Sequence, residues 1–145
     1  MAVYDEKMRS RVVRELAMEA AMADALRKEE FEMYLQPQIS LKKSGVLRAE
    51  ALVRWRGADG KLIFPADFID LFEREGIIFR LDYYMLEQAC RFLKQWLRQQ
   101  GRPLCISVNV SRTTMLQPDF TENCRRLKRQ YEYPTDIWSW NLPRA

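Results

Sequence analysis

The chain of 145 residues contains no histidine. This absence excludes serine–histidine and cysteine–histidine nucleophile pairs, and it excludes histidine-ligated zinc. Any metal ion would have to be bound by oxygen ligands, which favours magnesium, calcium or manganese. Cysteine is scarce as well: Cys90, Cys105 and Cys124 form no CxxC pair. Their odd number, inside expected helices and a strand, indicates reduced core thiols and a cytoplasmic location.

The sequence also lacks an apolar run of membrane-spanning length, and its N-terminus is charged, so we expect no membrane span and no signal peptide. Hydrophobic residues make up 48% and charged residues 30%, as in an ordinary globular domain. The net charge is +4, and the excess is concentrated in residues 125–129. Because no aromatic residues interleave with these charges, we favour a solvated helix face over a nucleic-acid-binding patch.

Glycine and proline are absent from residues 1–30, which are rich in good helix formers and predict one long helix. Apolar residues recur on it at helical spacing, at Tyr4, Met8, Val12, Leu16 and Ala20. Such a stripe needs a covering surface, either the body of the domain or a partner helix.

The rest of the chain predicts an α/β domain. Strict alternation predicts strands at residues 31–39, 46–55 and 104–110, and the short polar turn between the first two makes them antiparallel. Helical periodicity predicts helices at 65–76 and 80–100, with a third from 113 or 118 to 130, whereas 131–145 has no clear period. The βα alternation in the second half predicts a growing parallel sheet, although three strands do not close a barrel.

The second strand carries charges opposite its apolar face, and these suggest a binding site. Glu50 and Arg54 alternate with apolar residues. A half-exposed strand could place them in water, but sheets of this class are covered on both faces, where unpaired charges are costly. We therefore expect both residues to bind something.

The polar sides of the three strands carry Gln36, Glu50, Leu52, Arg54 and Asn109. Adjacent strands would bring Glu50 and Asn109 together as half of a hard-cation site, and the Arg54 guanidinium suits a phosphate. Alternatively, Asn109 is a turn residue at the end of its strand and Arg54 forms an ion pair at the rim.

Residues 49–55 (AEALVRW), which include the Glu50-Ala51-Leu52 tripeptide, resemble the signature of EAL domains, bacterial phosphodiesterases for cyclic di-GMP. Further segments match the family in the same order: 31–38 (FEMYLQPQ), 64–69 (FPADFI), 72–78 (FEREGII), 86–90 (LEQAC), 107–111 (SVNVS) and 118–120 (PDF). As an ordered set these motifs are specific, and the resemblance covers about residues 30–129. Residues 1–29 resemble the helix that often links a diguanylate-cyclase-type (GGDEF) domain to an EAL domain.

The resemblance implies an EAL-type, TIM-like (β/α)8 barrel whose first strand is antiparallel. It implies hydrolysis of cyclic di-GMP to the linear dinucleotide with two Mg²⁺ or Mn²⁺ ions. The residues that match metal ligands in the family are Glu50 and Asn109. Those that match dinucleotide contacts are Gln36, Leu52 and Arg54.

The sequence departs from the family near Thr135, where a fourth strand with another metal-ligating glutamate is expected. The resemblance therefore predicts an incomplete barrel with about three strands, divided into a linker helix at 1–29, the N-terminal part of an EAL domain at 30–131 and a non-family tail at 132–145. We expect such a chain to be catalytically inactive alone, to bind cyclic di-GMP weakly if at all, and to form homo-oligomers through its exposed sheet edge. The alternatives are a purely structural interaction fragment, or a phosphodiesterase that is active only when another chain completes it.

Overall fold

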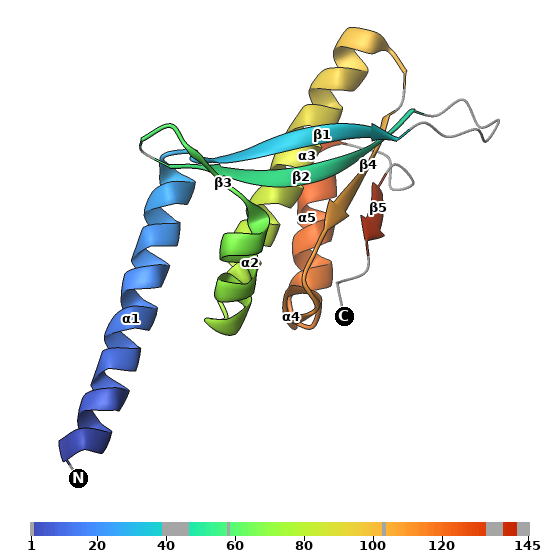
Figure 1. Cartoon of the computed structure of the whole chain (residues 1–145). Coiled ribbons are helices and arrows are strands. Elements are labelled where there is room, and N and C mark those ends of the chain that lie inside the picture. The colour runs from blue at the N-terminus through green and yellow to red at the C-terminus, as the bar shows by residue number, and fades with distance from the viewer. Residues whose placement is uncertain (1, 39–46, 58, 103, 133–137, 142–145) are drawn as a thin grey trace.

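The structure is a computed structural model that describes residues 2–38, 47–57, 59–102, 104–132 and 138–141. The chain forms both helices and strands, as Figure 1 shows. In order they are α1 (Ala2–Arg27), β1 (Phe31–Gln38), β2 (Leu47–Arg56), β3 (Leu62–Ile63), α2 (Pro65–Arg74), α3 (Ile78–Gln100), β4 (Leu104–Asn109), α4 (Arg112–Met115), α5 (Phe120–Tyr131) and β5 (Trp138–Asn141).

The strands form a single mixed sheet in the order β1-β2-β4-β5, with β3 paired to β2 beside this path. The β1–β2 pair is antiparallel, whereas β2–β4 and β4–β5 are parallel. The predicted antiparallel hairpin and the parallel addition of the third predicted strand are therefore confirmed. The turn expected at residues 40–45 lies outside the described residues.

The structure adds three elements to those expected. The two-residue strand β3 was not predicted, because a pairing this short leaves no periodic signal. The last predicted helix, with a start at 113 or 118, corresponds to α5, and the short helix α4 precedes it as a separate element. The tail, in which no regular element was expected, contains β5, which pairs in parallel with β4. The sheet therefore has five strands rather than about three.

Local chemistry sets the ends of the helices. Pro65 occupies the first turn of α2, where its missing N–H costs nothing, and Gly76 has the left-handed φ of 70° expected after this helix. Gly101 ends α3 with a φ of 65°, and its N–H donates to the carbonyl of Leu97. These ends fix where α2 and α3 meet the sheet.

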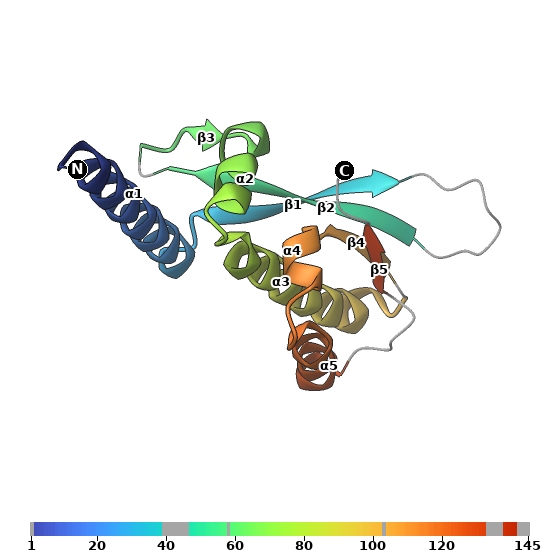
Figure 2. The same ribbon diagram turned by 90° about the horizontal axis from the view of Figure 1, so that it is seen from below.

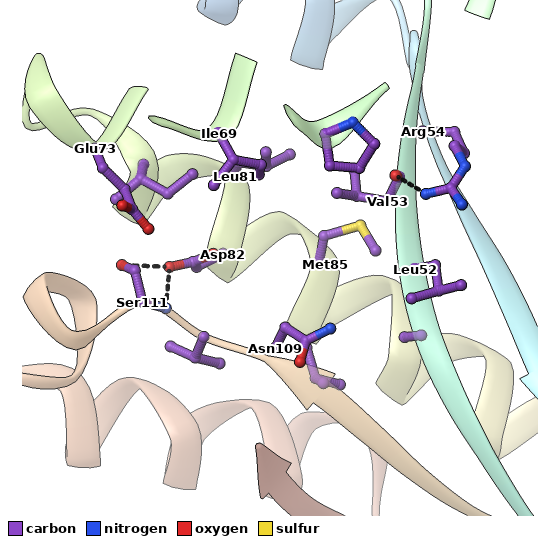
Figure 3. Close-up of a pocket in the computed structure, with 15 residues that line it drawn as sticks. Leu52, Val53, Arg54, Ile69, Glu73, Leu81, Asp82, Met85, Asn109 and Ser111 are labelled. Carbon is purple, nitrogen blue, oxygen red and sulfur yellow. Dashed lines mark hydrogen bonds between the residues drawn. The ribbon is translucent and has the colours of Figure 1, made fainter. Parts of the chain in front are cut away.

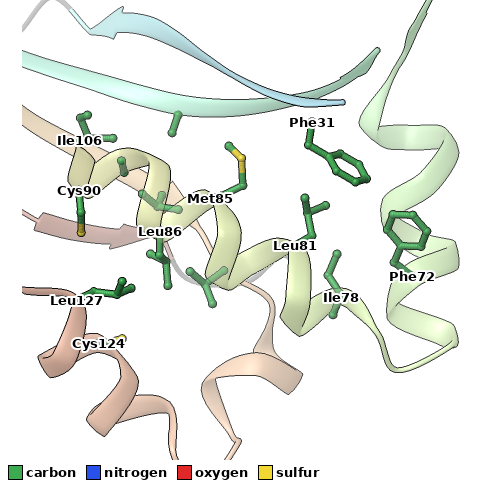
Figure 4. Close-up of a cluster of buried hydrophobic side chains, with 14 of the residues drawn as sticks. Phe31, Phe72, Ile78, Leu81, Met85, Leu86, Cys90, Ile106, Cys124 and Leu127 are labelled. Carbon is green, nitrogen blue, oxygen red and sulfur yellow. The ribbon is translucent and has the colours of Figure 1, made fainter. Parts of the chain in front are cut away.

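The core lies between one face of the sheet and the helices α2, α3 and α5 (Figures 1 and 2). Figure 4 shows side chains of α3 between β4 and α5, with Phe31 and Phe72 at the far end of the cluster. Phe31 packs against Trp55, Phe68 and Phe72, with ring centroids 5.1–6.4 Å apart. From β1 and β2 only one face contributes to this core. We expected both faces to be covered, and in the described part of the chain that expectation is wrong.

Helix α1 leaves most of its apolar stripe exposed. Met8, Val12 and Leu16 are 54%, 52% and 60% exposed, whereas Met22 and Ala25 near its C-terminus are buried. The body of the domain therefore covers only the last turns, and the alternative of a partner helix stays a prediction. No helix in the described ranges is long and apolar enough to cross a membrane.

Candidate functional site

The polar face of the sheet is formed by alternate residues of β1 and β2. Glu50, Leu52 and Arg54 share one side of β2, because successive side chains of a strand point to opposite faces. Gln36 of β1 lies directly opposite Glu50 in the antiparallel register, so these two side chains share a face. The face is only partly covered, since Glu50 and Arg54 are of intermediate burial and Gln36 is exposed.

Glu50 and Asn109 lie in contact across the parallel β2–β4 pair. The Asn109 side-chain amide donates from Nδ2 to Oε1 of Glu50, and the two atoms are 3.3 Å apart. The register explains the contact. Glu50 pairs with Ser107, and Asn109, the last residue of β4, lies two residues further along the same face of that strand. The predicted proximity of the carboxylate and the amide is therefore present in the structure.

The donor set of this pair fits part of a hard-cation site. Carboxylate and amide oxygens are the ligands that Mg²⁺ and Mn²⁺ prefer. Within the described ranges, no group of three or more acidic or cysteine side chains could hold a metal ion. Glu50 and Asn109 therefore supply an incomplete ligand set, and their role as metal ligands stays a prediction.

Arg54 has no carboxylate partner among the ion pairs of the described residues. Its Nη1 donates to the Val53 carbonyl at 2.8 Å. Its Cζ lies 6.0 Å from the ring centroid of Tyr34 and 5.8 Å from that of Phe64. The guanidinium is thus held against aromatic rings, with hydrogen-bonding capacity left for an anion.

The ion pair that we considered for Arg54 is made by Arg56 instead. Glu32 lies opposite Arg54 in the register, yet its Oε1 accepts from Nε of Arg56 at 2.7 Å. This bond is the main reason why the pKa of the Glu32 carboxyl lies below its ordinary value. Arg56 also donates to the Tyr34 hydroxyl at 3.2 Å. The Glu32 carboxylate, which the register places opposite Arg54, is therefore already paired with Arg56.

A cavity of about 300 Å³ opens at the carboxyl ends of β2 and β4, beside α2 and α3 (Figure 3). Of the five predicted site residues, Leu52, Arg54 and Asn109 line it, whereas Gln36 and Glu50 do not. Strand ends of this kind are where α/β folds place their ligands. The cavity brings an apolar side chain, a cation and an amide together.

A buried carboxylate beside this cavity was missed in the sequence. Asp82 of α3 is 6% exposed, and its Oδ2 accepts hydrogen bonds from three groups that follow β4. The donors are the Ser111 N–H at 3.0 Å, the Ser111 hydroxyl at 2.9 Å and the Thr114 hydroxyl at 2.6 Å. Figure 3 shows both bonds between Ser111 and Asp82. Burial raises the pKa of Asp82 above its usual value, against the opposing effect of these bonds.

This cluster fixes the path of the chain just after Asn109. Ser111 caps α4, because its side chain accepts from the Thr114 N–H, and the same residue is tied to α3 by Asp82. One signal could have revealed the cluster, since Asp82 interrupts a row of buried apolar residues on α3. A single carboxylate on such a buried face needs hydrogen-bond donors from another part of the chain, because burying it without them is costly.

The fold and the site together define an α/β domain whose open sheet carries a polar face and a cavity at its strand ends. Comparison with known families then places it: the sequence model of the EAL domain matches residues 19–138. Because this match covers more than half of the chain, the protein belongs to the EAL domain family. The resemblance found in the motifs of the sequence is confirmed.

Relatives of known sequence agree with this assignment. The chain is 32% identical over 127 residues to the cyclic di-GMP phosphodiesterase NbdA of Pseudomonas aeruginosa, covering 88% of this chain and 16% of NbdA. It is 36% identical over 104 residues to the uncharacterized Mycobacterium tuberculosis protein Rv1357c, covering 71% and 34%. The chain therefore spans 34% of the length of one of these relatives and 16% of the other.

A solved structure confirms the fold. The FimX EAL domain of Pseudomonas aeruginosa bound to c-di-GMP matches with a TM-score of 0.77 at 19% identity, covering 85% of this chain and 48% of that chain. The chain thus has the fold of part of an EAL domain, as expected for an incomplete TIM-like barrel.

Proposed function

We propose that the polar face of β1, β2 and β4 binds cyclic di-GMP. The observation that carries this proposal is the contact between Glu50 and Asn109. Arg54 lies four residues further along the same face of β2 and forms no ion pair with a described carboxylate. The naming of NbdA as a cyclic di-GMP phosphodiesterase supports the choice of ligand. A carboxylate and an amide on one strand pair, followed by an unneutralised guanidinium, suit a phosphodiester with bound cations.

In this proposal each predicted site residue has one task. Oxygens of Glu50 and Asn109 would hold Mg²⁺ or Mn²⁺, and a rotation of the Asn109 amide from its present bond would turn Oδ1 toward the ion. Bound metal would polarise the phosphate and lower the pKa of a water. Arg54 would bind a phosphate oxygen, Leu52 would contact the ligand in the cavity, and Gln36 would hydrogen bond to it from β1.

We further propose that this chain binds cyclic di-GMP without hydrolysing it alone. A two-metal centre needs more oxygen ligands than the Glu50–Asn109 pair, and no other group in the described residues is arranged to complete it. Hydrolysis would then need further oxygen ligands from outside the described residues. The outer edge of β1, which pairs only with β2 among the described strands, is the surface that we propose for self-association.

Titration calorimetry with cyclic di-GMP and Mg²⁺ tests the binding proposal. We expect saturable binding that weakens about 10- to 100-fold in Arg54→Ala, since a charge-assisted bond to a phosphate is lost. Arg98→Ala, on the exposed end of α3, is the matched control and should bind as the parent chain does. The absence of binding to the parent chain would favour the alternative of a purely structural interaction fragment.

Two further measurements test the remaining parts. We expect Glu50→Gln and Asn109→Ala to reduce the Mg²⁺ dependence of binding, whereas binding that keeps its full Mg²⁺ dependence in both would exclude them as ligands. Chromatographic analysis of cyclic di-GMP incubated with the chain should detect no linear dinucleotide. Light scattering across a concentration series should detect a dimer, and a monomer throughout would contradict self-association.

A further inference from the structure

The side chain of Phe64 is exposed to solvent. This residue lies directly before α2 and is 56% exposed, whereas Phe31, Phe68 and Phe72 nearby are buried. Tyr34, on β1, is also partly exposed at 39%. Leaving two aromatic rings in water is unfavourable, so their position beside Arg54 calls for a functional explanation.

The backbone around Phe64 fixes where its ring lies. Phe64 has the extended φ of −80° and ψ of 152° typical of the residue before a helix, and the following Pro65 restricts it further. Pro65 and Arg54 both line the cavity at the ends of β2 and β4, so Phe64 stands at its rim. Its ring centroid is 5.8 Å from Cζ of Arg54.

Tyr34 also lies against the Arg54 guanidinium. Its ring centroid is 6.0 Å from Cζ of Arg54, and its hydroxyl accepts a hydrogen bond from Arg56 at 3.2 Å. Arg56 is in turn fixed by its ion pair with Glu32. The rings of Tyr34 and Phe64 and the guanidinium of Arg54 therefore form a pre-arranged set of planar groups.

We propose that Phe64, together with Tyr34 and Arg54, forms a stacking surface for one purine base of the nucleotide ligand. This inference rests on the proposed binding of cyclic di-GMP and adds the residues that recognise its base. Every nucleobase has an apolar π-face that stacks on aromatic rings and on guanidinium planes. Arg54 would then bind phosphate through its N–H groups while the base covers the exposed ring of Phe64.

Calorimetric titration of variants with cyclic di-GMP and Mg²⁺ tests the assignment. We expect Phe64→Ala to weaken binding at least about tenfold and Phe64→Trp to restore it, because loss of one stacked base has effects of this size. Phe79→Ala is the matched control, because Phe79 lies against Arg80 with the same 5.8 Å separation but does not line the cavity. This variant should bind as the parent chain does.

A fluorescence measurement separates stacking from an indirect effect on Arg54. A cyclic dinucleotide in which 2-aminopurine replaces one guanine should lose fluorescence on binding to the parent chain, since stacking quenches this base, and should keep it in Phe64→Ala at saturating protein. Equal quenching in both proteins would overturn the stacking assignment.

The outcomes also separate this inference from the proposed function. Binding that is lost in Arg54→Ala but unchanged in Phe64→Ala would refute the stacking surface and leave the cyclic di-GMP site intact. No binding by the parent chain would refute both. Weaker self-association of Phe64→Ala, with ligand binding unchanged, would show that the exposed ring serves a protein contact and would also overturn the inference.

Discussion

The hydrogen bonds of Asp82 should couple strongly to Thr114, and a double-mutant cycle measures this coupling. Asp82→Ala removes the acceptor of three hydrogen bonds, and Thr114, which is 0% exposed, then has no access to water in place of the carboxylate. Hydrogen bonds to a charged group contribute about 1.5–3 kcal/mol each, and removing the buried charge offsets part of their loss. We expect Asp82→Ala to lower the free energy of unfolding by about 2–4 kcal/mol.

Thr114→Val replaces the buried hydroxyl by a methyl group of similar size and should cost about 1–2 kcal/mol. The double variant should be more stable than the sum of the two single effects predicts, by about 1–2 kcal/mol, because the bond between Thr114 and Asp82 is lost only once. The Thr114 hydroxyl keeps its 2.9 Å contact with the Ser111 hydroxyl in Asp82→Ala, which limits the size of this coupling. The coupling would identify Thr114 as the main buried partner of Asp82.

Urea unfolding of the four proteins at constant pH, with equal m-values, gives the coupling energy directly. A second cycle that pairs Asp82→Ala with Thr121→Val, an exposed threonine of α5, is the control and should be additive within about 0.5 kcal/mol. If the Asp82–Thr114 cycle is equally additive, the reasoning that this cluster holds the segment after Asn109 is refuted.

Three further predictions concern pH, packing and thiol chemistry. Because burial raises the pKa of Asp82 above 3.8, stability should fall as the pH rises through that pKa, and Asp82→Asn should gain stability relative to the parent chain between about pH 4 and pH 7 in urea unfolding. A stability difference between Asp82→Asn and the parent chain that stays constant over this pH range would contradict the prediction. Phe72→Ala, at a side chain 1% exposed, should lose about 3–5 kcal/mol of unfolding free energy by the same assay, and a loss below about 1 kcal/mol would argue against the aromatic cluster. Burial raises the pKa of Cys90 to about 12 and that of Cys124 to about 11, so both thiols should react with a thiol reagent near pH 8 only after unfolding; rapid labelling of either in the native protein would contradict their burial.

Several site features could be predicted because they depend on neighbours in the sequence. Alternation along β2 placed Glu50, Leu52 and Arg54 on one face, and the short turn before β2 made its pairing with β1 antiparallel. With the further expectation that the third predicted strand lies beside the second, the proximity of Glu50 and Asn109 was predicted, and it is present. The domain boundaries at 29 and 131 and the roles of the site residues stay predictions.

Other features depend on contacts between distant segments, which no local period encodes. The sequence did not indicate that Arg56 rather than Arg54 would pair with Glu32, since both arginines lie on the same face of β2. It also did not indicate that Asp82 would meet Ser111 and Thr114, which lie 29 and 32 residues further along the chain. The Glu32–Arg56 pair is set across β1 and β2, whereas the Asp82 contacts are set by the packing of α3 against β4 and the segment that follows it.

The sequence by itself therefore determined the order of the longer helices and strands, the antiparallel hairpin and the polar side of β2, because residue spacing and turn length act locally. Only the tertiary structure decided which face of the sheet is covered, which charges are neutralised and which carboxylate is buried. Those outcomes depend on how desolvation and pairing balance once helices and strands from distant parts of the chain are packed together.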